Sequence, residues 1–403
     1  MKGLFIIMGS LLLAIIYISF ISLGLPDSLL GSAWPVVHLE MDVPTSFAGI
    51  VSMTIFLGTI LSSLMSGKLL SRFGAGKVTV VSTIMTAVGL LGFSLSTQFW
   101  MLVLWAIPYG LGAGGVDAIL NNYVALHYKP QHMSWLHCMW GVGATISPYI
   151  MSFSLIRFEC WNYGYLIVAI IQAILSVFMI FSLPMWKNGT GSDKQCGESV
   201  PAKSLSFREI FSIKGALPCF IIAFCYCALE LTIILWVSTY LVDMWKFTPE
   251  DAAGFASMFY IGITFGRFVN GFLVMKFSDK FLIRMGLCIV TVGIGLLFVP
   301  FHSTFALVGF VLIGLGGAPI YPCIIHMMPV IFGEEKSQAL IGVEMAFAYT
   351  GFLLMPPLFG WIADLISISL LPIYLCVFLV LMFVMHEIVV GISSKKDKKV
   401  GTV

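Results

Sequence analysis

The sequence predicts an all-α membrane protein with twelve transmembrane helices, arranged as two pseudo-symmetric six-helix bundles. Hydrophobic residues make up 59% of the 403 positions and charged residues only 10%, whereas about a quarter of an average soluble domain is charged. The apolar residues gather in stretches that can cross about 30 Å of hydrocarbon, which takes roughly 20 residues in a helix. Basic residues fall almost entirely into alternate connections between these stretches. These three observations together predict a polytopic fold.

Polar and charged breaks divide the chain into twelve predicted spans. The first half gives 4–37, 46–66, 78–97, 99–126, 134–155 and 161–183, and the second half gives 216–241, 252–274, 281–300, 303–328, 337–363 and 368–391. The first span is too long for a straight crossing, so it must tilt or extend beyond the hydrocarbon. No small-residue cleavage site closes it, which indicates a membrane helix rather than a signal peptide.

One connection is long and polar, at residues 184–215, and it divides the spans into six plus six. Its charged, Gly- and Ser-containing composition predicts a mobile linker with a short amphipathic helix around 205–212. The predicted organisation is an N-terminal bundle over 1–183, a cytoplasmic linker over 184–215, a C-terminal bundle over 216–391 and a cytoplasmic tail over 392–403.

The distribution of lysine and arginine predicts the orientation. With the N-terminus in the cytoplasm, 18 of the 21 basic residues lie inside, Arg157 and Lys246 lie outside, and Arg267 lies within a span. An odd number of spans in either half would destroy this asymmetry. We therefore expect both chain ends in the cytoplasm.

The two halves resemble each other in a glycine-rich segment at the fourth span of each. Residues 110–114 read G-L-G-A-G and residues 314–318 read G-L-G-G-A. Such parallel repeats are typical of two halves that move about a central site. A nucleotide-binding loop is a poorer interpretation, because the spacing is not G-x-G-x-x-G and no soluble strand precedes it; close helix packing by small residues explains the segment better.

Four acidic residues stand deep within apolar spans: Asp27, Asp117, Glu230 and Glu344. A carboxylate in hydrocarbon is costly, so such a residue usually faces a cavity or a partner and is a candidate proton carrier. Glu230 lies near mid-membrane by residue count. Glu344 is only eight residues past Lys336, so a salt bridge or an interfacial carboxylate competes equally with a functional role.

Two of these acids have neighbours that suggest binding. Asp27 follows the helix-disturbing segment 24–26, Gly-Leu-Pro, where freed carbonyl groups can help to bind a polar substrate. Asp117 lies in a run of small residues, and Asn121 follows four residues later on the same helical face.

Arg267 is the only basic residue deep inside a span, and it either pairs with a membrane carboxylate or extends to the inner surface as part of a gate. We favour the gate. His137 and His326 lie near predicted inner span ends, where a lone histidine more often packs between helices than relays protons.

Aromatic side chains accompany two of the acids. Trp34 lies seven residues after Asp27 and Trp236 six after Glu230, so each shares roughly the face of its acid. An aromatic face beside carboxylates and amides suits a sugar, and equally an aromatic or cationic drug. The weaker candidates of this kind are Tyr109, Asn122, Trp140 and Tyr321.

The sequence predicts no disulfide framework, metal site or nucleotide-binding site. The nine cysteines are scattered through apolar stretches with no disulfide framework or metal-type spacing. No Walker motif is present, so ATP is not the energy source of this chain. We expect no metal, no cofactor, no nucleic-acid partner and no enzymatic reaction.

The six-plus-six layout resembles the major facilitator superfamily, whose loop between spans 2 and 3 carries a motif near G-x-x-x-D-R-x-G. Residues 67–74 read G-K-L-L-S-R-F-G, in which Ser71 replaces the aspartate. The resemblance implies a major facilitator fold with Arg72 as a gating residue, and Ser71 cannot supply the carboxylate of the usual charge relay at this gate.

Within that superfamily the chain resembles the fucose permease-like sugar–proton symporters. Residues 26–30, P-D-S-L-L, are similar to their T-D-T-L-L element, and residues 117–121, D-A-I-L-N, to their E-T-A-A-N element. Segment 136–148 is similar to their helix 5 pattern. The resemblance implies that Asp27 and Asp117 bind sugar and carry the proton. The cavity-lining spans 1, 4, 7 and 10 of the superfamily add Glu230 and Tyr321 by position.

The expected function is proton-coupled uptake of a sugar or related polyol by alternating access, by a monomer in a bacterial cytoplasmic membrane. Asp117 is the expected main protonation site. Asp27, Asn121, Asn122 and Glu230 are expected to bind substrate beside the aromatic residues. The alternatives are proton-driven export of drugs or metabolites, a membrane sensor that binds a sugar without transport, and carriers of other solutes. A third cavity acid, Glu230, also leaves a cationic ligand or sodium coupling open.

Overall fold

The computed structural model describes residues 2–127, 130–188 and 207–400. Every regular element in these ranges is a helix, and twelve helical segments are long and apolar enough to cross a membrane. This confirms the predicted fold class and the number of spans. The orientation with both ends inside stays a prediction.

The first six spans are built from seven helices. They are α1 (Lys2–Asp27), α2 (Leu29–Glu40), α3 (Ala48–Phe73), α4 (Ala75–Ser94), α5 (Phe99–His127), α6 (Pro130–Phe158) and α7 (Asn162–Asn188), with a 3-10 turn, η1, at Thr45–Phe47.

The last six spans are built from eight helices, preceded by α8 (Phe207–Ser212). They are α9 (Ala216–Trp245), α10 (Pro249–Phe255), α11 (Ser257–Leu273), α12 (Asp279–Leu297), α13 (Ser303–Gly317), α14 (Ile320–Phe332), α15 (Glu334–Leu365) and α16 (Leu371–Val400), with a 3-10 turn, η3, at Ile368–Leu370.

Three spans that the sequence reads as single helices are interrupted. The first breaks at Ser28, directly after Pro26 and Asp27, and the tenth breaks at Ala318 and Pro319. Proline lacks the amide hydrogen and clashes with the carbonyl one turn back, so each break lies where the chain supplies a proline. The eighth span breaks at Ala256, between α10 and α11, and no proline explains that interruption.

The connecting segments match the prediction in part. The short helix expected around 205–212 is α8, at Phe207–Ser212. Residues 189–206 of the predicted linker lie outside the described residues. α16 continues to Val400 and so includes most of the predicted tail. Lysine is a good helix former, and this segment lacks proline.

Contacts divide the chain into two compact units. Unit 1 contains residues 1–195, 234–260 and 360–368, and unit 2 contains 196–233, 261–359 and 369–403. The helices α9, α11 and α15 therefore contribute residues to both units. The division into bundles over 1–183 and 216–391 stays a prediction.

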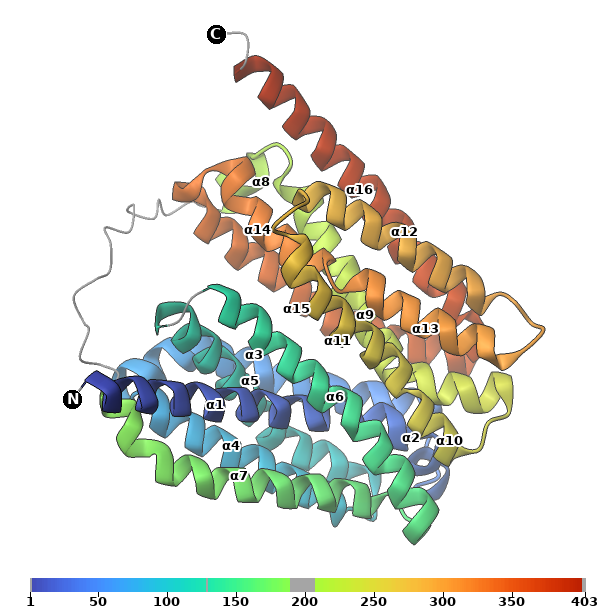
Figure 1. Cartoon of the computed structure of the whole chain (residues 1–403). Helices are drawn as coiled ribbons and strands as arrows, with labels where there is room; N and C mark the ends of the chain where they lie inside the picture. Colours follow the sequence, from blue (N-terminus) through green and yellow to red (C-terminus); the bar gives the residue numbers. More distant parts are fainter. Residues whose placement is uncertain (1, 128–129, 189–206, 401–403) are drawn as a thin grey trace. The chain divides into compact units, whose positions relative to one another are not determined.

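Within unit 1, α5 packs against both α3 and α4, α4 packs against α7, and α1 packs against α6. Figure 1 shows α1, α6 and α7 running alongside one another in this unit. Gly24 and Gly143 explain the close approach of α1 and α6. A Cβ at Gly24 would lie 2.0 Å from the Trp140 carbonyl oxygen, and one at Gly143 would lie 1.9 Å from that of Ile21.

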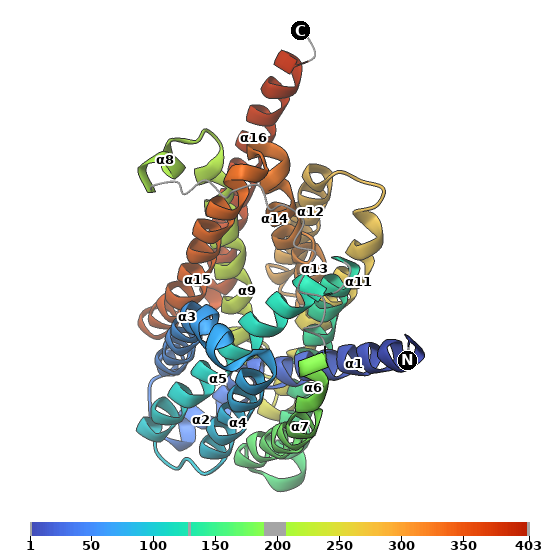
Figure 2. The ribbon, with the colours of Figure 1, turned by 90° about the vertical axis from the view of Figure 1, so that its left-hand side faces the viewer.

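Within unit 2, α12 packs against α13, α14 and α16, as Figure 2 shows for α12, α13 and α14. The glycines of the tenth span serve this packing. A Cβ at Gly316 would lie 2.5 Å from the carbonyl oxygen of Gly286 on α12. In unit 1, a Cβ at Gly110 on α5 would lie 2.2 Å from the carbonyl oxygen of Ile55 on α3. The glycine-rich segments of spans 4 and 10 are therefore helix contacts, which agrees with the interpretation from sequence.

Candidate functional site

Asp27 lies at the break of the first span, where three helices of unit 1 meet. Its Oδ1 atom accepts a hydrogen bond from the Tyr109 hydroxyl at 3.0 Å, and its Oδ2 atom accepts one from the indole Nε1 of Trp140 at 2.7 Å. The next residue, Ser28, donates its hydroxyl to the Ala144 carbonyl oxygen at 3.0 Å. The break thus brings a carboxylate, a phenol and an indole together, with the donors coming from α5 and α6.

Asp117 lies further along α5, eight residues after Tyr109, which corresponds to about 12 Å along the helix axis. Asn121 donates its amide to the Asp117 Oδ1 atom at 2.9 Å and to the Asp117 main-chain carbonyl at 3.0 Å. The carbonyl oxygen of the Asn121 side chain is buried and has no hydrogen-bond partner among the described residues. The predicted pair on one helical face is therefore formed, and it retains an acceptor for another group.

Asn122 follows on the same helix, and its side chain lies outside the described part of the chain. Its predicted contact with substrate stays a prediction.

Trp34 and Trp236 are both fully buried, at 0% exposure. The indole of Trp34 donates to the Thr45 carbonyl oxygen at 2.7 Å, and its ring stacks on His38 with centroids 6.3 Å apart. A Cβ at Gly360 would lie 2.7 Å from the Trp236 ring. Both tryptophans are thus part of a packed core in unit 1. The tryptophan that bonds Asp27 is Trp140, which the sequence treated as a weaker candidate.

In unit 2, Glu230 on α9 forms an ion pair with Arg267 on α11, with 3.2 Å between Oε1 and Nη2. The side chains are 6% and 16% exposed. This is the carboxylate pairing that the sequence left as the alternative to a surface gate. Because Arg267 offsets the charge of Glu230, that acid is not an isolated anion. A gating role for Arg267 stays a prediction.

Tyr226 and Tyr321 form an aromatic pair close to this ion pair. Tyr321 on α14 stacks on Tyr226 with ring centroids 6.1 Å apart and an interplanar angle of 18°. Tyr226 lies four residues before Glu230, so both project from one face of α9. The sequence analysis missed Tyr226, although its spacing from Glu230 could have indicated it.

The predicted gating residue Arg72 and the two histidines singled out from the sequence lie outside this group. Arg72 is exposed at the end of α3, with its guanidinium 5.3 Å from the Phe73 ring centroid, and the Ser71 side chain lies outside those described. The rings of His137 and Phe20 form a T-shaped pair, with centroids 6.0 Å apart. His326 is 74% exposed, and its Nδ1 atom lies 2.8 Å from Asp279 Oδ2.

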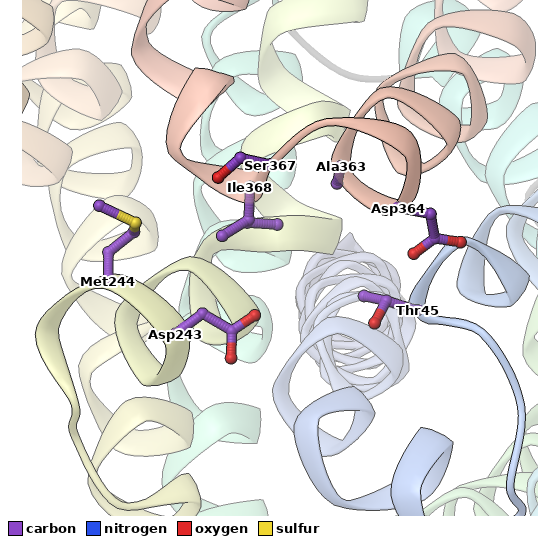
Figure 3. A pocket seen from close by; sticks show the side chains of 7 residues that line it. All are labelled: Thr45, Asp243, Met244, Ala363, Asp364, Ser367 and Ile368. Atoms are coloured by element: carbon purple, nitrogen blue, oxygen red, sulfur yellow. The ribbon is translucent and has the colours of Figure 1, made fainter.

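A cavity of about 280 Å³ lies elsewhere in unit 1 and contains none of the predicted site residues. Asp243 and Asp364 lie on opposite sides of it, with Thr45 beside Asp364 (Figure 3). The carboxylate of Asp364 accepts a hydrogen bond from the Ser46 amide, at 3.0 and 3.2 Å from its two oxygens. Asp364 thus ties the end of α15 to η1 within this unit. The predicted orientation places this cavity at the outer surface.

No group of three or more histidine, cysteine, aspartate or glutamate side chains in the described ranges could hold a metal ion. The eight described cysteines with an assigned state are all free thiols.

The sequence matches the family model of the Major Facilitator Superfamily over residues 16–248 and 219–402. Among similar curated proteins, Bypass of stop codon protein 6 of Saccharomyces cerevisiae is 22% identical, covering 92% of this chain and 80% of that protein. The glucose/mannose transporter GlcP of Bacillus subtilis is 21% identical, covering 86% of each. The multidrug efflux pump SdrM of Staphylococcus aureus is 25% identical, but over only 43% of this chain and 39% of that protein.

Solved structures with the same fold include a bacterial homologue of the human lysosomal transporter Spinster, in an inward-facing and unoccupied conformation. It superposes with a TM-score of 0.74 at 13% identity, covering 96% of this chain and 97% of that one. The nucleoside transporter NupG superposes with the same TM-score at 15% identity, covering 94% and 98%. At these identities the likeness concerns the fold.

Proposed function

The chain belongs to the Major Facilitator Superfamily, and we propose that it takes up a sugar or related polyol together with a proton. Its twelve apolar helices and its family make it a multi-pass integral membrane protein that carries a small-molecule solute. The solute, the coupling ion, the direction of transport and the bacterial cytoplasmic membrane belong to the proposal.

The observation that carries the proposal is the group formed by Asp27, Tyr109 and Trp140 at the break of the first span. A sugar presents hydroxyl groups at its rim and apolar C–H groups on its faces. A carboxylate with indole and phenol rings beside it offers a partner to each. The 21% identity to a glucose/mannose transporter over 86% of the chain supports the same substrate class.

We assign the coupling proton to Asp117. Its carboxyl accepts a side-chain hydrogen bond from a neutral amide, that of Asn121. It can therefore take up a proton without breaking an ion pair, whereas Glu230 would have to release Arg267. The pairing of Glu230 also weakens the argument for sodium or a cationic ligand, which depended on a third uncompensated acid in the cavity.

In the proposed cycle, the two halves of the protein expose the site to each side of the membrane in turn. Asp27, Asn121 and Asn122 hold the sugar hydroxyls, and substrate contacts by Glu230 and Tyr321 stay predictions. Binding of substrate and proton together, and not of either alone, would favour the change between the two states, which is what coupling requires.

Uptake of labelled sugars by proteoliposomes under an imposed pH gradient tests this proposal. We expect accumulation by the unmodified chain and none by Asp117→Asn, because a carboxamide neither binds nor releases a proton near neutral pH. Asp42→Asn is the matched control, since Asp42 is an exposed acid whose positive φ of 52° asparagine also tolerates. Accumulation by Asp117→Asn at the level of the unmodified chain would contradict the assignment.

Export of drugs or metabolites is the second candidate, and the partial similarity to the efflux pump SdrM favours it. It predicts that cells lacking the protein become hypersensitive to lipophilic cations. It also predicts that sugars produce no proton flux in proteoliposomes. The same preparation therefore decides between the two candidates.

A further inference from the structure

A glutamate lies on the packed face of α15, in a stripe of otherwise apolar residues. Leu340, Glu344, Ala348 and Gly351 recur at helical spacing and are all buried. A Cβ at Gly351 would lie 2.5 Å from the Phe224 carbonyl oxygen, so this face of α15 packs directly on the backbone of α9. The ring of Phe347 lies 5.5 Å from that of Phe220 on α9, which closes the same interface.

Glu344 itself is fully buried, at 0% exposure, and neither carboxyl oxygen has a hydrogen-bond partner among the described residues. The titratable groups that act on it from α9 are the thiols of Cys219 and Cys227, both buried. These are neutral groups and cannot compensate a negative charge.

An ionised carboxylate in these surroundings would cost several kcal/mol, because it would have lost its water without gaining a cation or donors. A protonated carboxyl avoids most of that cost. The contrast within unit 2 is direct, since the other buried glutamate, Glu230, has Arg267 as its partner. A proton bound at Glu344 would take the place that the guanidinium takes at Glu230.

We propose that Glu344 is a second proton-binding site of this chain, occupied in the conformation described here and emptied when α15 shifts against α9. Its part in coupling depends on the proposed function, but its occupancy by a proton does not. Both helices that enclose Glu344 continue along the chain from unit 2 into unit 1. A change of conformation between the units can therefore be transmitted to this interface along α9 and α15.

Infrared spectroscopy of the full chain in liposomes tests the occupancy. We expect a carbonyl band of a protonated carboxyl that is absent from Glu344→Gln and retained in Glu230→Gln, the matched buried acid with a cation partner. In the unmodified chain the band should lose intensity as the pH is raised. A spectrum that Glu344→Gln leaves unchanged would overturn the proposal, and so would a band that persists unaltered up to the pH at which the protein unfolds.

Transport assays test the role in coupling. We expect Glu344→Gln to keep substrate counterflow, which needs no net proton movement, and to lose accumulation driven by a pH gradient. The control is Glu387→Gln, which changes an acid that is 51% exposed. Normal gradient-driven accumulation by Glu344→Gln would exclude the coupling role.

If the unmodified chain accumulates no sugar, the proposed function fails. The infrared measurement still decides in that case whether Glu344 binds a proton. If Glu344→Gln does not fold, the pH titration of the carboxyl band in Asp117→Asn, which lacks the other proposed proton site, decides this instead.

Discussion

Asp27 in unit 1 and Glu230 in unit 2 are both acids within membrane spans, but the protein satisfies them in different ways. Asp27 accepts hydrogen bonds from two neutral donors, Tyr109 and Trp140, at a break between helices. Glu230 lies within the continuous helix α9 and pairs with the cation Arg267. A carboxylate held by two neutral donors can accept further hydrogen bonds from substrate hydroxyl groups, because its two oxygens have about four acceptor sites. A carboxylate held by a buried cation cannot leave it without exposing two charges.

The comparison teaches that the position of an acid in a span does not by itself reveal its role. The near mid-membrane position of Glu230 made it a strong candidate for proton binding, yet the structure gives it a partner. Asp27 accepts hydrogen bonds from a phenol and an indole, and Asp117 accepts one from an amide; their roles in binding and proton exchange stay proposals.

The largest effect is expected from breaking the buried pair. Arg267→Met leaves Glu230 without its cation and should destabilise the protein by about 3–5 kcal/mol, the usual cost of an uncompensated buried charge. Adding Glu230→Gln should restore much of that stability. Thermal unfolding of the purified variants measures both. If Arg267→Met alone were as stable as the unmodified chain, the ion pair would contribute nothing to the stability of the protein.

The second effect concerns the hydrogen bonds to Asp27. Trp140→Phe removes one bond to a charged group, worth about 1.5–3 kcal/mol, and should weaken substrate binding roughly tenfold or more. Trp161→Phe is the matched control, because the Trp161 indole donates to Glu40 at 2.7 Å, outside the candidate site. Binding of the transported sugar measures the difference, and equal affinities for the two variants would contradict the role given to Trp140.

The third effect tests how the break is held in place. Gly24→Ala would bring a methyl group to 2.0 Å from the Trp140 carbonyl oxygen and force α1 away from α6. We expect a loss of about 1–3 kcal/mol, as is usual for overpacking, together with weaker substrate binding. Gly295→Ala on α12 is the control, since nothing lies within 4 Å of the added methyl group. Unfolding and binding are measured for both, and the same stability in the two variants would contradict this packing argument.

The smallest effect is expected from breaking an exposed ion pair of unit 2, which is then compared with the buried pair. Arg284 and Glu387 form two hydrogen bonds, at 2.9 and 2.7 Å, but their side chains are 50% and 51% exposed. Arg284→Gln should therefore cost no more than about 1 kcal/mol. Thermal unfolding in parallel with Arg267→Met measures the contrast. A cost equal to that of Arg267→Met would show that burial does not set the value of these pairs.

The sequence by itself determined the features that depend on local composition. Apolar length fixed the twelve spans, because each must cross the hydrocarbon with its backbone hydrogen bonds made within the helix. The spacing of Asp117 and Asn121 predicted a pair that the structure forms. Pro26 indicated a disturbance in the first span. It did not indicate that the helix would divide at Ser28.

Only the tertiary structure decided which side chains meet. Tyr109 and Trp140 are 82 and 113 residues from Asp27, and helical periodicity carries no information about partners on other helices. The same holds for the pairing of Glu230 with Arg267 across 37 residues, and for the burial of Trp34 away from solvent. Glu344 shows the limit most clearly. Its sequence position left a functional role and a salt bridge or interfacial position equally open. Only packing against α9 gave it a fully buried site without a hydrogen-bond partner among the described residues.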